Sequence, residues 1–234
     1  MSVNITMKTV FKICALAFLL SACGTAEQEE TLTVEAEVPL SLIDRVQATV
    51  AETQREAMEA LPEEIAGLKS VEPVADREKN QRGAGFTRVY TADGIVATVF
   101  IYNNQNFNVP EKADADLETL MDKHLKEFQS MQDSGLYTDV KTGNKKPREF
   151  RWKSVKYQVL EADVQFSQKD EQKKSLLVLG TNKDLMSYVR IRYTFSQSEQ
   201  AAVNKKNPVF TRTVMVALND FAAAQTKPVA EQGM

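Results

Sequence analysis

The stretch GFTRVYTADGIVATVFIY, residues 85–102, decides the class of fold. Two β-rich segments, residues 85–91 and 95–102, lie on either side of Asp93-Gly94. Because an Asp-Gly pair between two such segments is a strong hairpin signal, the stretch predicts two neighbouring antiparallel strands. Both alternating faces of the second segment are largely apolar: Ile95, Ala97, Val99 and Ile101 on one, Val96 and Phe100 on the other. We therefore expect a central strand that is covered on both sides.

Three amphipathic helices are expected around this hairpin. The clearest covers residues 114–131, where side chains of one helix face recur at the spacing i, i+3, i+4 and i+7. These side chains are Leu117, Leu120, Met121, His124, Leu125, Phe128 and Met131. A second helix is predicted over residues 41–61. A third is predicted to begin at Asn207 as its N-cap, with Pro208 in its first position.

A β-rich block separates the last two of these helices in the chain order. Residues 149–166 form a long strand or a strand pair, whose apolar phase shifts twice and so requires a turn or a bulge. Residues 175–180 form a buried strand, and residues 187–195 alternate regularly. In this last strand the inward side chains are expected to be Val189, Ile191, Tyr193 and Phe195, and the outward ones Arg190, Arg192 and Thr194.

This order of elements predicts an α+β fold, with amphipathic helices packed on a mostly antiparallel sheet in a single domain, residues 40–226. The order and the hairpins resemble the Mog1/PsbP-like fold. Three segments, LPEEIAGLKSVE, GAGFTRVY and ATVFIYN, are also similar to a family of uncharacterised bacterial envelope proteins.

Residues 1–22 have the layout of a secretory signal, with a basic start, the apolar run ICALAFLL and small residues at the end. The tetrapeptide Leu20-Ser21-Ala22-Cys23 resembles the lipobox of bacterial lipoproteins. This resemblance implies cleavage before Cys23, a diacylglyceryl group on its thiol and attachment to a membrane. Two or three acyl chains give a firm anchor, since each buried methylene adds about 0.8 kcal/mol.

The mature chain would then start with an acidic tether, residues 23–39, and end in a loose tail, residues 227–234. Cleavage removes Lys8 and Lys12 and no acid, so the formal charge falls from −3 to −5. An acidic protein is not expected to bind nucleic acid. Gly24 stands where inner-membrane lipoproteins of Gram-negative bacteria carry Asp, so the resemblance implies the outer membrane, facing the periplasm.

The most unusual local composition lies in residues 141–153. The basic residues there are Lys141, Lys145, Lys146, Arg148, Arg151 and Lys153. They stand against a single acid, Glu149, and surround Trp152, the only tryptophan of the chain. Such a patch can bind anionic lipid headgroups or an acidic protein partner. The alternative interpretation is a solvated hairpin whose charges protect an exposed edge.

Candidate catalytic residues are few, and no known catalytic motif or cofactor fingerprint occurs. His124 is the only histidine, and its place on the apolar face of a predicted helix favours a buried histidine over a base or a metal ligand. Glu161 and Asp163 share one strand face and Asp93 lies at a hairpin tip, but a solvated surface explains these acids better. We therefore expect no enzymatic activity, no cofactor and no metal.

The sequence thus favours a lipid-anchored envelope protein that acts as a non-enzymatic binding or scaffolding module. One alternative is a hydrolase of envelope polymers that uses paired carboxylates. The other is a carrier of an apolar ligand held between sheet and helices. The pocket of such a carrier would contain Phe86, Tyr90, Phe100 and Tyr102.

Overall fold

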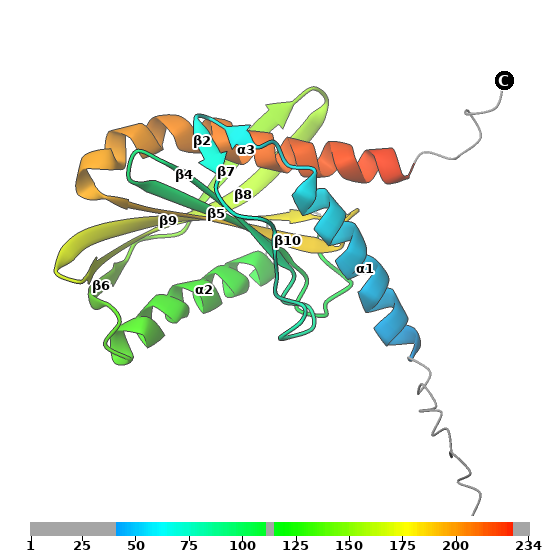
Figure 1. Ribbon diagram of the computed structural model, residues 1–234, viewed down its shortest axis with the longest axis horizontal. Coiled ribbons are helices and arrows are strands. Elements are labelled where there is room, and N and C mark those ends of the chain that lie inside the picture. The colour runs from blue at the N-terminus through cyan, green and yellow to red at the C-terminus, as the bar shows by residue number, and fades with distance from the viewer. Residues whose placement is uncertain (1–40, 111–114, 227–234) are drawn as a thin grey trace, which may run out of the picture. The chain divides into compact units, whose positions relative to one another are not determined.

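The computed structural model describes residues 41–110 and 115–226, which contain one ten-stranded sheet with helices on both of its faces (Figure 1). The strands follow the order β1-β2-β4-β5-β10-β9-β8-β6, with β3 paired to β4 and β7 paired to β8. All of these pairings are antiparallel. The predicted α+β class with a mostly antiparallel sheet is confirmed.

The hairpin that was expected from the Asp-Gly pair is formed by β4 (Phe86–Ala92) and β5 (Ile95–Tyr102). Asp93 and Gly94 make the turn, with φ angles of 48° and 77°. Both residue types tolerate this left-handed conformation, which two-residue hairpin turns require. β5 pairs with β4 on one side and with β10 on the other, so it is a central strand of the sheet.

The remaining strands include three long ones that follow each other as a meander. These three are β8 (Val155–Gln168), β9 (Glu171–Asn182) and β10 (Ser187–Ser196). The shorter ones are β1 (Glu64–Ile65), β2 (Leu68–Ser70), β3 (Ala75–Asp76), β6 (Thr138–Thr142) and β7 (Lys146–Trp152). A turn between β7 and β8 provides one of the phase changes that the sequence required.

Helices α1 (Leu42–Glu59) and α3 (Gln200–Gln225) pack on one face of the sheet, which we call the upper face. Helix α2 (Ala115–Asp133) packs on the opposite, lower face (Figure 1). A short 3₁₀ turn, η1 (Gln197–Glu199), leads into α3. Each face has its own buried apolar cluster, and both clusters lie within residues 57–222. The described part of the chain therefore supplies a hydrophobic core on each side of its sheet.

Helix α3 begins eight residues earlier than the sequence predicted. Its first residue is Gln200, so Asn207 and Pro208 lie inside the helix and do not cap it. The segment before Asn207 is rich in Ala, Lys and Gln, which form helices readily. Pro208 cannot donate to the carbonyl of Asn204, but Asn204 is exposed, so water can bind that carbonyl. The buried Asn207 side chain instead donates to Glu161 at 3.1 Å and accepts from Thr211 at 2.8 Å.

Candidate ligand-binding surface on the lower face

The lower face is crossed by rows of side chains that run from strand to strand, because the strands pair in register. One row consists of Thr87, Phe100, Arg190, Leu179 and Leu160. The next consists of Val89, Thr98, Arg192, Leu177 and Ala162. Each row is polar or mixed at β4 and β5, carries an arginine on β10 and is apolar at β9 and β8. The order of side chains across the strands thus divides this face into a mixed half on β4 and β5 and an apolar half on β9 and β8.

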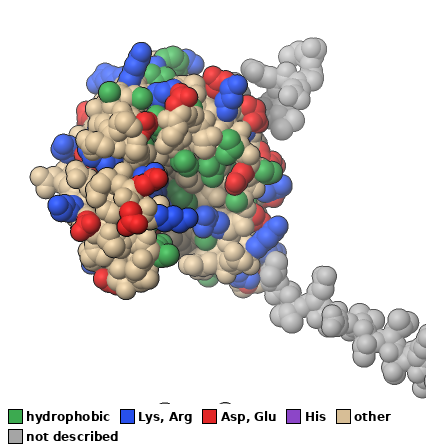
Figure 2. All heavy atoms as spheres, turned by 60° about the vertical axis from the view of Figure 1, so that its left-hand side comes forward, with side chains coloured by type: hydrophobic (Ala, Val, Ile, Leu, Met, Phe, Trp, Pro, Cys, Tyr) green, Lys and Arg blue, Asp and Glu red, His purple; other side chains and the backbone are tan. Residues whose placement is uncertain are grey.

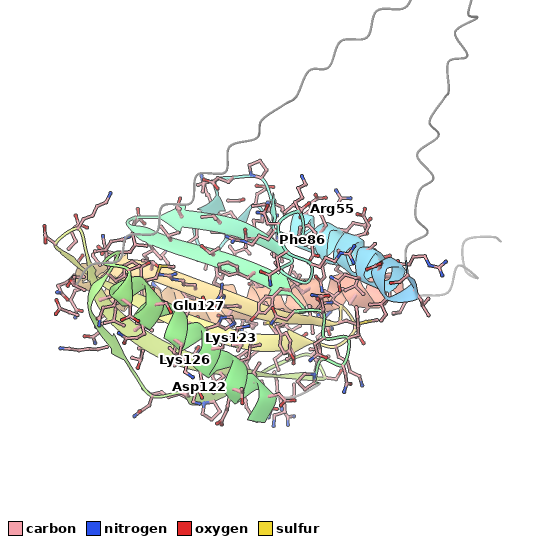
Figure 3. The ribbon with its side chains drawn as sticks, turned by 90° about the horizontal axis from the view of Figure 1, so that it is seen from below. Arg55, Phe86, Asp122, Lys123, Lys126 and Glu127 are labelled. Carbon is pink, nitrogen blue, oxygen red and sulfur yellow. The ribbon has the colours of Figure 1, made fainter. Side chains whose placement is uncertain are left out.

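Helix α2 covers the apolar half, where it packs against β6, β8 and β9. Strands β4 and β5 lie beside α2 without a helix over them when the molecule is seen from below (Figure 3). We call this part the open half, and it consists of Val89, Thr91, Val96, Thr98 and Phe100. The side chain of Val96 is 39% exposed, and the other four are half-buried. The prediction that β5 is covered on both sides is therefore wrong for the lower face from Val96 to Phe100, whereas Tyr102 at its end is buried under α2.

Arg190 lies at the boundary between the covered and the open half. Its Nη1 donates to Oε2 of Glu127 on α2 at 2.9 Å. The guanidinium carbon lies 4.1 Å from the centre of the Phe100 ring, in a cation–π contact. Only 15% of the Arg190 side chain is exposed, and its Nε has no hydrogen-bond partner among the described residues. Glu127 balances the charge of this arginine, and Phe100 covers one side of it.

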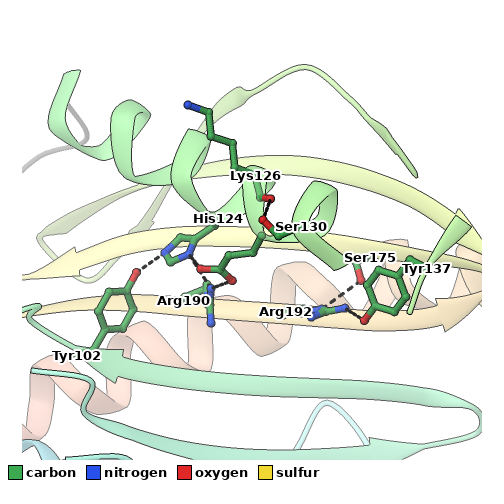
Figure 4. A network of polar contacts seen from close by, with 9 residues as sticks. Tyr102, His124, Lys126, Ser130, Tyr137, Ser175, Arg190 and Arg192 are labelled. Carbon is green, nitrogen blue, oxygen red and sulfur yellow. Dashed lines mark hydrogen bonds and ion pairs between the residues drawn. The ribbon is translucent and has the colours of Figure 1, made fainter. Parts of the chain in front are cut away.

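The ion pair between Arg190 and Glu127 continues into a buried histidine (Figure 4). Nδ1 of His124 lies 2.7 Å from Oε1 of Glu127, and its Nε2 lies 2.6 Å from the hydroxyl of Tyr102. Burial lowers the pKa of His124, which favours the neutral ring. Nη1 of Arg190 also lies 2.6 Å from Nδ1 of His124, so this ring nitrogen has both a guanidinium donor and a carboxylate acceptor within hydrogen-bond distance. Tyr102, His124, Glu127 and Arg190 thus form one connected polar network between β5, α2 and β10.

Glu127 and Tyr102, which both contact His124, also have shifted pKa values. Burial by itself would raise the pKa of Glu127, but the hydrogen bond from His124 and the charge of Arg190 outweigh it and lower the pKa to about 2. Burial raises the pKa of the Tyr102 phenol. Glu127 is therefore a carboxylate and Tyr102 a neutral phenol near neutral pH.

Arg192, two residues further along β10, has only neutral hydrogen-bond partners among the residues that the structure describes. Its Nη2 donates to the hydroxyl of Tyr137 at 3.1 Å, and its Nε to Oγ of Ser175 at 3.3 Å (Figure 4). Its guanidinium carbon lies 4.5 Å from the centre of the Phe128 ring. Within residues 41–110 and 115–226, no carboxylate lies within ion-pair distance of this half-buried arginine. The space-filling view shows a recess in which Lys and Arg side chains lie beside hydrophobic ones (Figure 2).

The basic segment predicted as an anionic-partner patch is divided between the two faces. Lys145 reaches α2 on the lower face, where it lies 2.8 Å from Asp122 and 3.9 Å from Glu118. Arg148 points to the upper face and pairs with Glu161 at 2.9 Å. The structure brings Lys146 and Arg148 together in a groove beside α3. The others, Lys141, Arg151 and Lys153, are exposed.

The paired carboxylates considered for a hydrolase, Glu161 and Asp163, do line one groove beside α3. Arg148 and Asn207 both donate to Oε1 of Glu161 there, so this oxygen already has two partners. Asp93 is exposed at the tip of the β4–β5 hairpin. The groove is lined by basic and amide side chains together with these two acids.

The four aromatic residues suggested for a carrier pocket do not face one another. Phe86 and Tyr90 belong to the upper core, whereas Phe100 and Tyr102 lie on the lower face. Because the sheet separates the two pairs, they cannot line one pocket. The predicted lipidation site, Cys23, lies outside the described residues, as do the predicted signal, tether and tail.

Arg190 and Arg192 were not among the predicted site residues, because the alternation of residues 187–195 assigned them to the solvent side of the strand. Alternation along the strand correctly placed them opposite Val189, Ile191 and Tyr193, which are buried in the upper core. It could not show that α2 would come to lie over that second face. Two arginines on alternate positions of an apolar strand were the signal that could have found them.

Of three comparisons with known proteins, the one with solved structures found matches. No protein-family model matches the chain, and no curated protein matches it. Among solved structures, the chain is similar to the solution structure of cyanobacterial PsbP (CyanoP) from Synechocystis sp. PCC 6803, with a TM-score of 0.39 and 15% sequence identity. The match covers 63% of this chain and 85% of that one.

The described residues contain neither a cluster of metal-binding side chains nor a membrane-spanning helix. In that part of the chain no three His, Cys, Asp or Glu side chains are grouped so that they could hold a metal ion. None of the helices in residues 41–110 and 115–226 is both long and apolar enough to cross a bilayer.

Proposed function

We propose that the protein is a lipid-anchored, non-enzymatic binding module of the bacterial cell envelope, which holds an anionic ligand on the open half of its lower sheet face. The ligand would place a carboxylate or phosphate against Arg192 and a less polar part over Val89, Val96 and Thr98. The anchor would be the acylated Cys23, and it would confine the module to the periplasmic side of the outer membrane.

The observation that carries this proposal is the difference between Arg192 and another arginine of the same sheet. Arg88 on β4 is 4% exposed, and its guanidinium donates to the carbonyls of Met58, Glu59 and Leu61. It also donates to the carboxylate of Glu63 at 2.6 Å, so the protein itself balances its charge. Within the described part of the chain, Arg192 binds only two hydroxyls. A half-buried cation without a counter-charge is costly, and an anionic ligand would remove that cost.

The surroundings of Arg192 indicate what else the ligand contains. Thr98 and Val89 lie in the same cross-strand row as Arg192, and Val96 and Thr91 lie in the neighbouring row, so apolar surface and hydroxyls adjoin this arginine on the sheet. A purely ionic ligand would leave the two valines in water, while a purely apolar one would leave the arginine unpaired. An anionic amphiphile matches both properties of the open half.

A binding function is also favoured over catalysis by the burial of the one network that resembles catalytic machinery. Tyr102, His124 and Glu127 have the order hydroxyl, imidazole, carboxylate that is typical of an activated nucleophile. However, Tyr102 is 5% exposed and His124 6% exposed, and burial raises the pKa of the phenol. A hydroxyl that substrate cannot reach serves to hold α2 on the sheet.

The experiment that tests the ligand site measures binding of octanoate and octyl phosphate by calorimetry and by their effect on the melting temperature. At ten times its dissociation constant, a ligand stabilises the folded chain by about 1.4 kcal/mol. We expect both anions to raise the melting temperature and 1-octanol to leave it unchanged. Arg192→Gln should abolish the effect. Arg55→Gln, which changes a half-buried arginine that pairs with Glu52 and Glu59 of its own helix, should keep it.

Failure of both anions to bind, or unchanged binding by Arg192→Gln, would overturn the ligand site. Circular dichroism and a cooperative urea transition show whether each variant is folded. The anchor is tested separately by mass spectrometry of the protein from bacterial membranes. We expect a diacylglyceryl group on Cys23 and no residues before it, and an unmodified thiol there contradicts the anchoring.

A further inference from the structure

The turn between β7 and β8 carries exposed apolar side chains at one corner of the molecule. Trp152 and Val155 are paired across the two strands and are 40% and 39% exposed. Lys153 makes the turn with a φ angle of 52°. An exposed tryptophan is unusual in a water-soluble turn, because this side chain is large and gains from leaving water.

Basic side chains surround this tryptophan. The guanidinium carbon of Arg212 on α3 lies 5.4 Å from the centre of the Trp152 ring, and Arg151 and Lys153 are exposed on either side of it in the chain. None of these three forms an ion pair with a carboxylate of the described residues. We call Arg151, Trp152, Lys153, Val155 and Arg212 the Trp152 tip.

Acids near the Trp152 tip do not cancel this charge. Glu149 on β7 accepts from Lys156 at 2.8 Å, and that hydrogen bond lowers its pKa, so this acid and this base neutralise each other. Asp184 lies in the adjoining groove, which Val155 and Lys156 also line. Asp220 on α3 faces Tyr157, the next upper-face position of β8 after Val155. Three basic residues around one exposed indole ring therefore have no carboxylate partner in residues 41–110 and 115–226.

We propose that the Trp152 tip is a second membrane contact, which inserts its indole ring among the headgroups of an anionic bilayer. Tryptophan favours the boundary between headgroups and acyl chains, since its ring is apolar and its N–H is a hydrogen-bond donor. Each basic residue beside an anionic surface raises the affinity about fivefold. The structure presents both kinds of side chain on one turn, which is the chemistry that recognises phosphate headgroups.

The geometry of the chain allows this contact together with a lipid on Cys23. Residues 23–41 can span up to roughly 60 Å at about 3.3 Å per residue, so the N-terminal anchor leaves the Trp152 tip free to reach the bilayer. A second contact would fix the orientation of the molecule on the membrane, which a single tether cannot do. None of the residues of the Trp152 tip belongs to the ligand site at Arg192.

The test uses the chain from Gly24 onward, which keeps every described residue and lacks the signal and the acylated cysteine. Trp152 is the only tryptophan, so the intrinsic fluorescence of the protein reports on the tip alone. With phosphatidylglycerol vesicles we expect the emission to shift to shorter wavelength and brominated lipid to quench it. With phosphatidylcholine vesicles we expect neither change. Binding should weaken as salt is added, because salt screens exposed charges.

Variants assign the binding to the proposed residues, with vesicle sedimentation as the readout. Lys153→Gln and Arg151→Gln should each lower the affinity about fivefold, and Trp152→Ala should remove most of the binding. Lys126→Gln, on the outer side of α2, is the matched control and should bind as the unaltered chain does (Figure 3). Urea unfolding verifies that each variant is folded.

Three results would overturn the membrane contact: no spectral shift with anionic vesicles, an equal shift with neutral ones, or full binding by Trp152→Ala. A protein partner at the tip would give the first of these results. The outcome is separate from that of the ligand site, because no small anion is used and Arg192 is unchanged throughout.

Discussion

The two faces of strand β5 differ in what covers them, although both are largely apolar in sequence. On the upper face Ile95, Ala97, Val99 and Ile101 are at most 1% exposed, because α1 and α3 lie over them. On the lower face Val96 is 39% exposed. The difference teaches that apolar character in a strand does not by itself show where a helix will pack. The lower face, which is left partly open, is the face on which Arg190 and Arg192 of β10 lie.

The upper face should lose the most stability when a large side chain is removed from it. Phe210 on α3 is fully buried and packs edge-on against Tyr90 and Tyr193, with ring centres 5.2 and 5.7 Å apart. Phe210→Ala is expected to lower the free energy of unfolding by about 3–5 kcal/mol, because it leaves a cavity between helix and sheet. Urea denaturation measures this loss. A loss below about 1 kcal/mol would mean that α3 is not firmly packed.

The free energy of unfolding should depend on pH through His124, which lies at the boundary between the covered and the open half. The unfolded chain binds a proton at the ordinary histidine pKa near 6.5, whereas burial lowers the pKa in the folded chain. Stability is therefore greatest above pH 6.5 and falls as the pH is lowered from there toward the folded pKa. Since His124 is the only histidine, His124→Gln should remove most of this decline between pH 7 and 5.

Urea unfolding at several pH values measures the effect of His124→Gln. The variant keeps a side chain that can bind Tyr102 or Glu127, so a general collapse of the network is not expected. Below about pH 4.5, protonation of Glu127 in the unfolded chain continues the same trend toward its folded pKa of about 2. An equal slope between pH 7 and 5 in both proteins would show that His124 is not held neutral by burial.

The open half should be the least sensitive to truncation. Val96→Ala removes a side chain that is already 39% exposed, so we expect a loss of less than about 1 kcal/mol in the free energy of unfolding. The same urea titration measures it beside Phe210→Ala. A loss comparable to that of Phe210→Ala would mean that another part of the molecule covers this face.

Local patterns in the sequence predicted several elements well. The hairpin at Asp93-Gly94 and the alternation of residues 187–195 agree with the structure, because both depend on neighbouring residues only. The helix predicted over residues 114–131 is observed as Ala115–Asp133. The short hairpin of β1 and β2 was missed, since strands of two and three residues show no periodicity.

The candidate site was less predictable, because its properties arise between segments that are distant in the sequence. Arg190 meets Glu127 across 63 positions of the chain, and Tyr102 meets His124 across 22. No spacing rule relates such pairs. For the same reason the six basic residues of 141–153 looked like one patch, although Lys145 and Arg148 pair with acids on opposite faces.

The sequence by itself determined which side chains share a strand face, because a strand alternates with a period of two whatever surrounds it. It also determined that helices with one apolar side must pack on this sheet. Only the tertiary structure decided that α2 lies over β8 and β9 and not over β4 and β5. That arrangement follows from how the whole chain packs. It gives Arg190 a carboxylate partner, Glu127 of α2, and leaves Arg192 without one among the described residues.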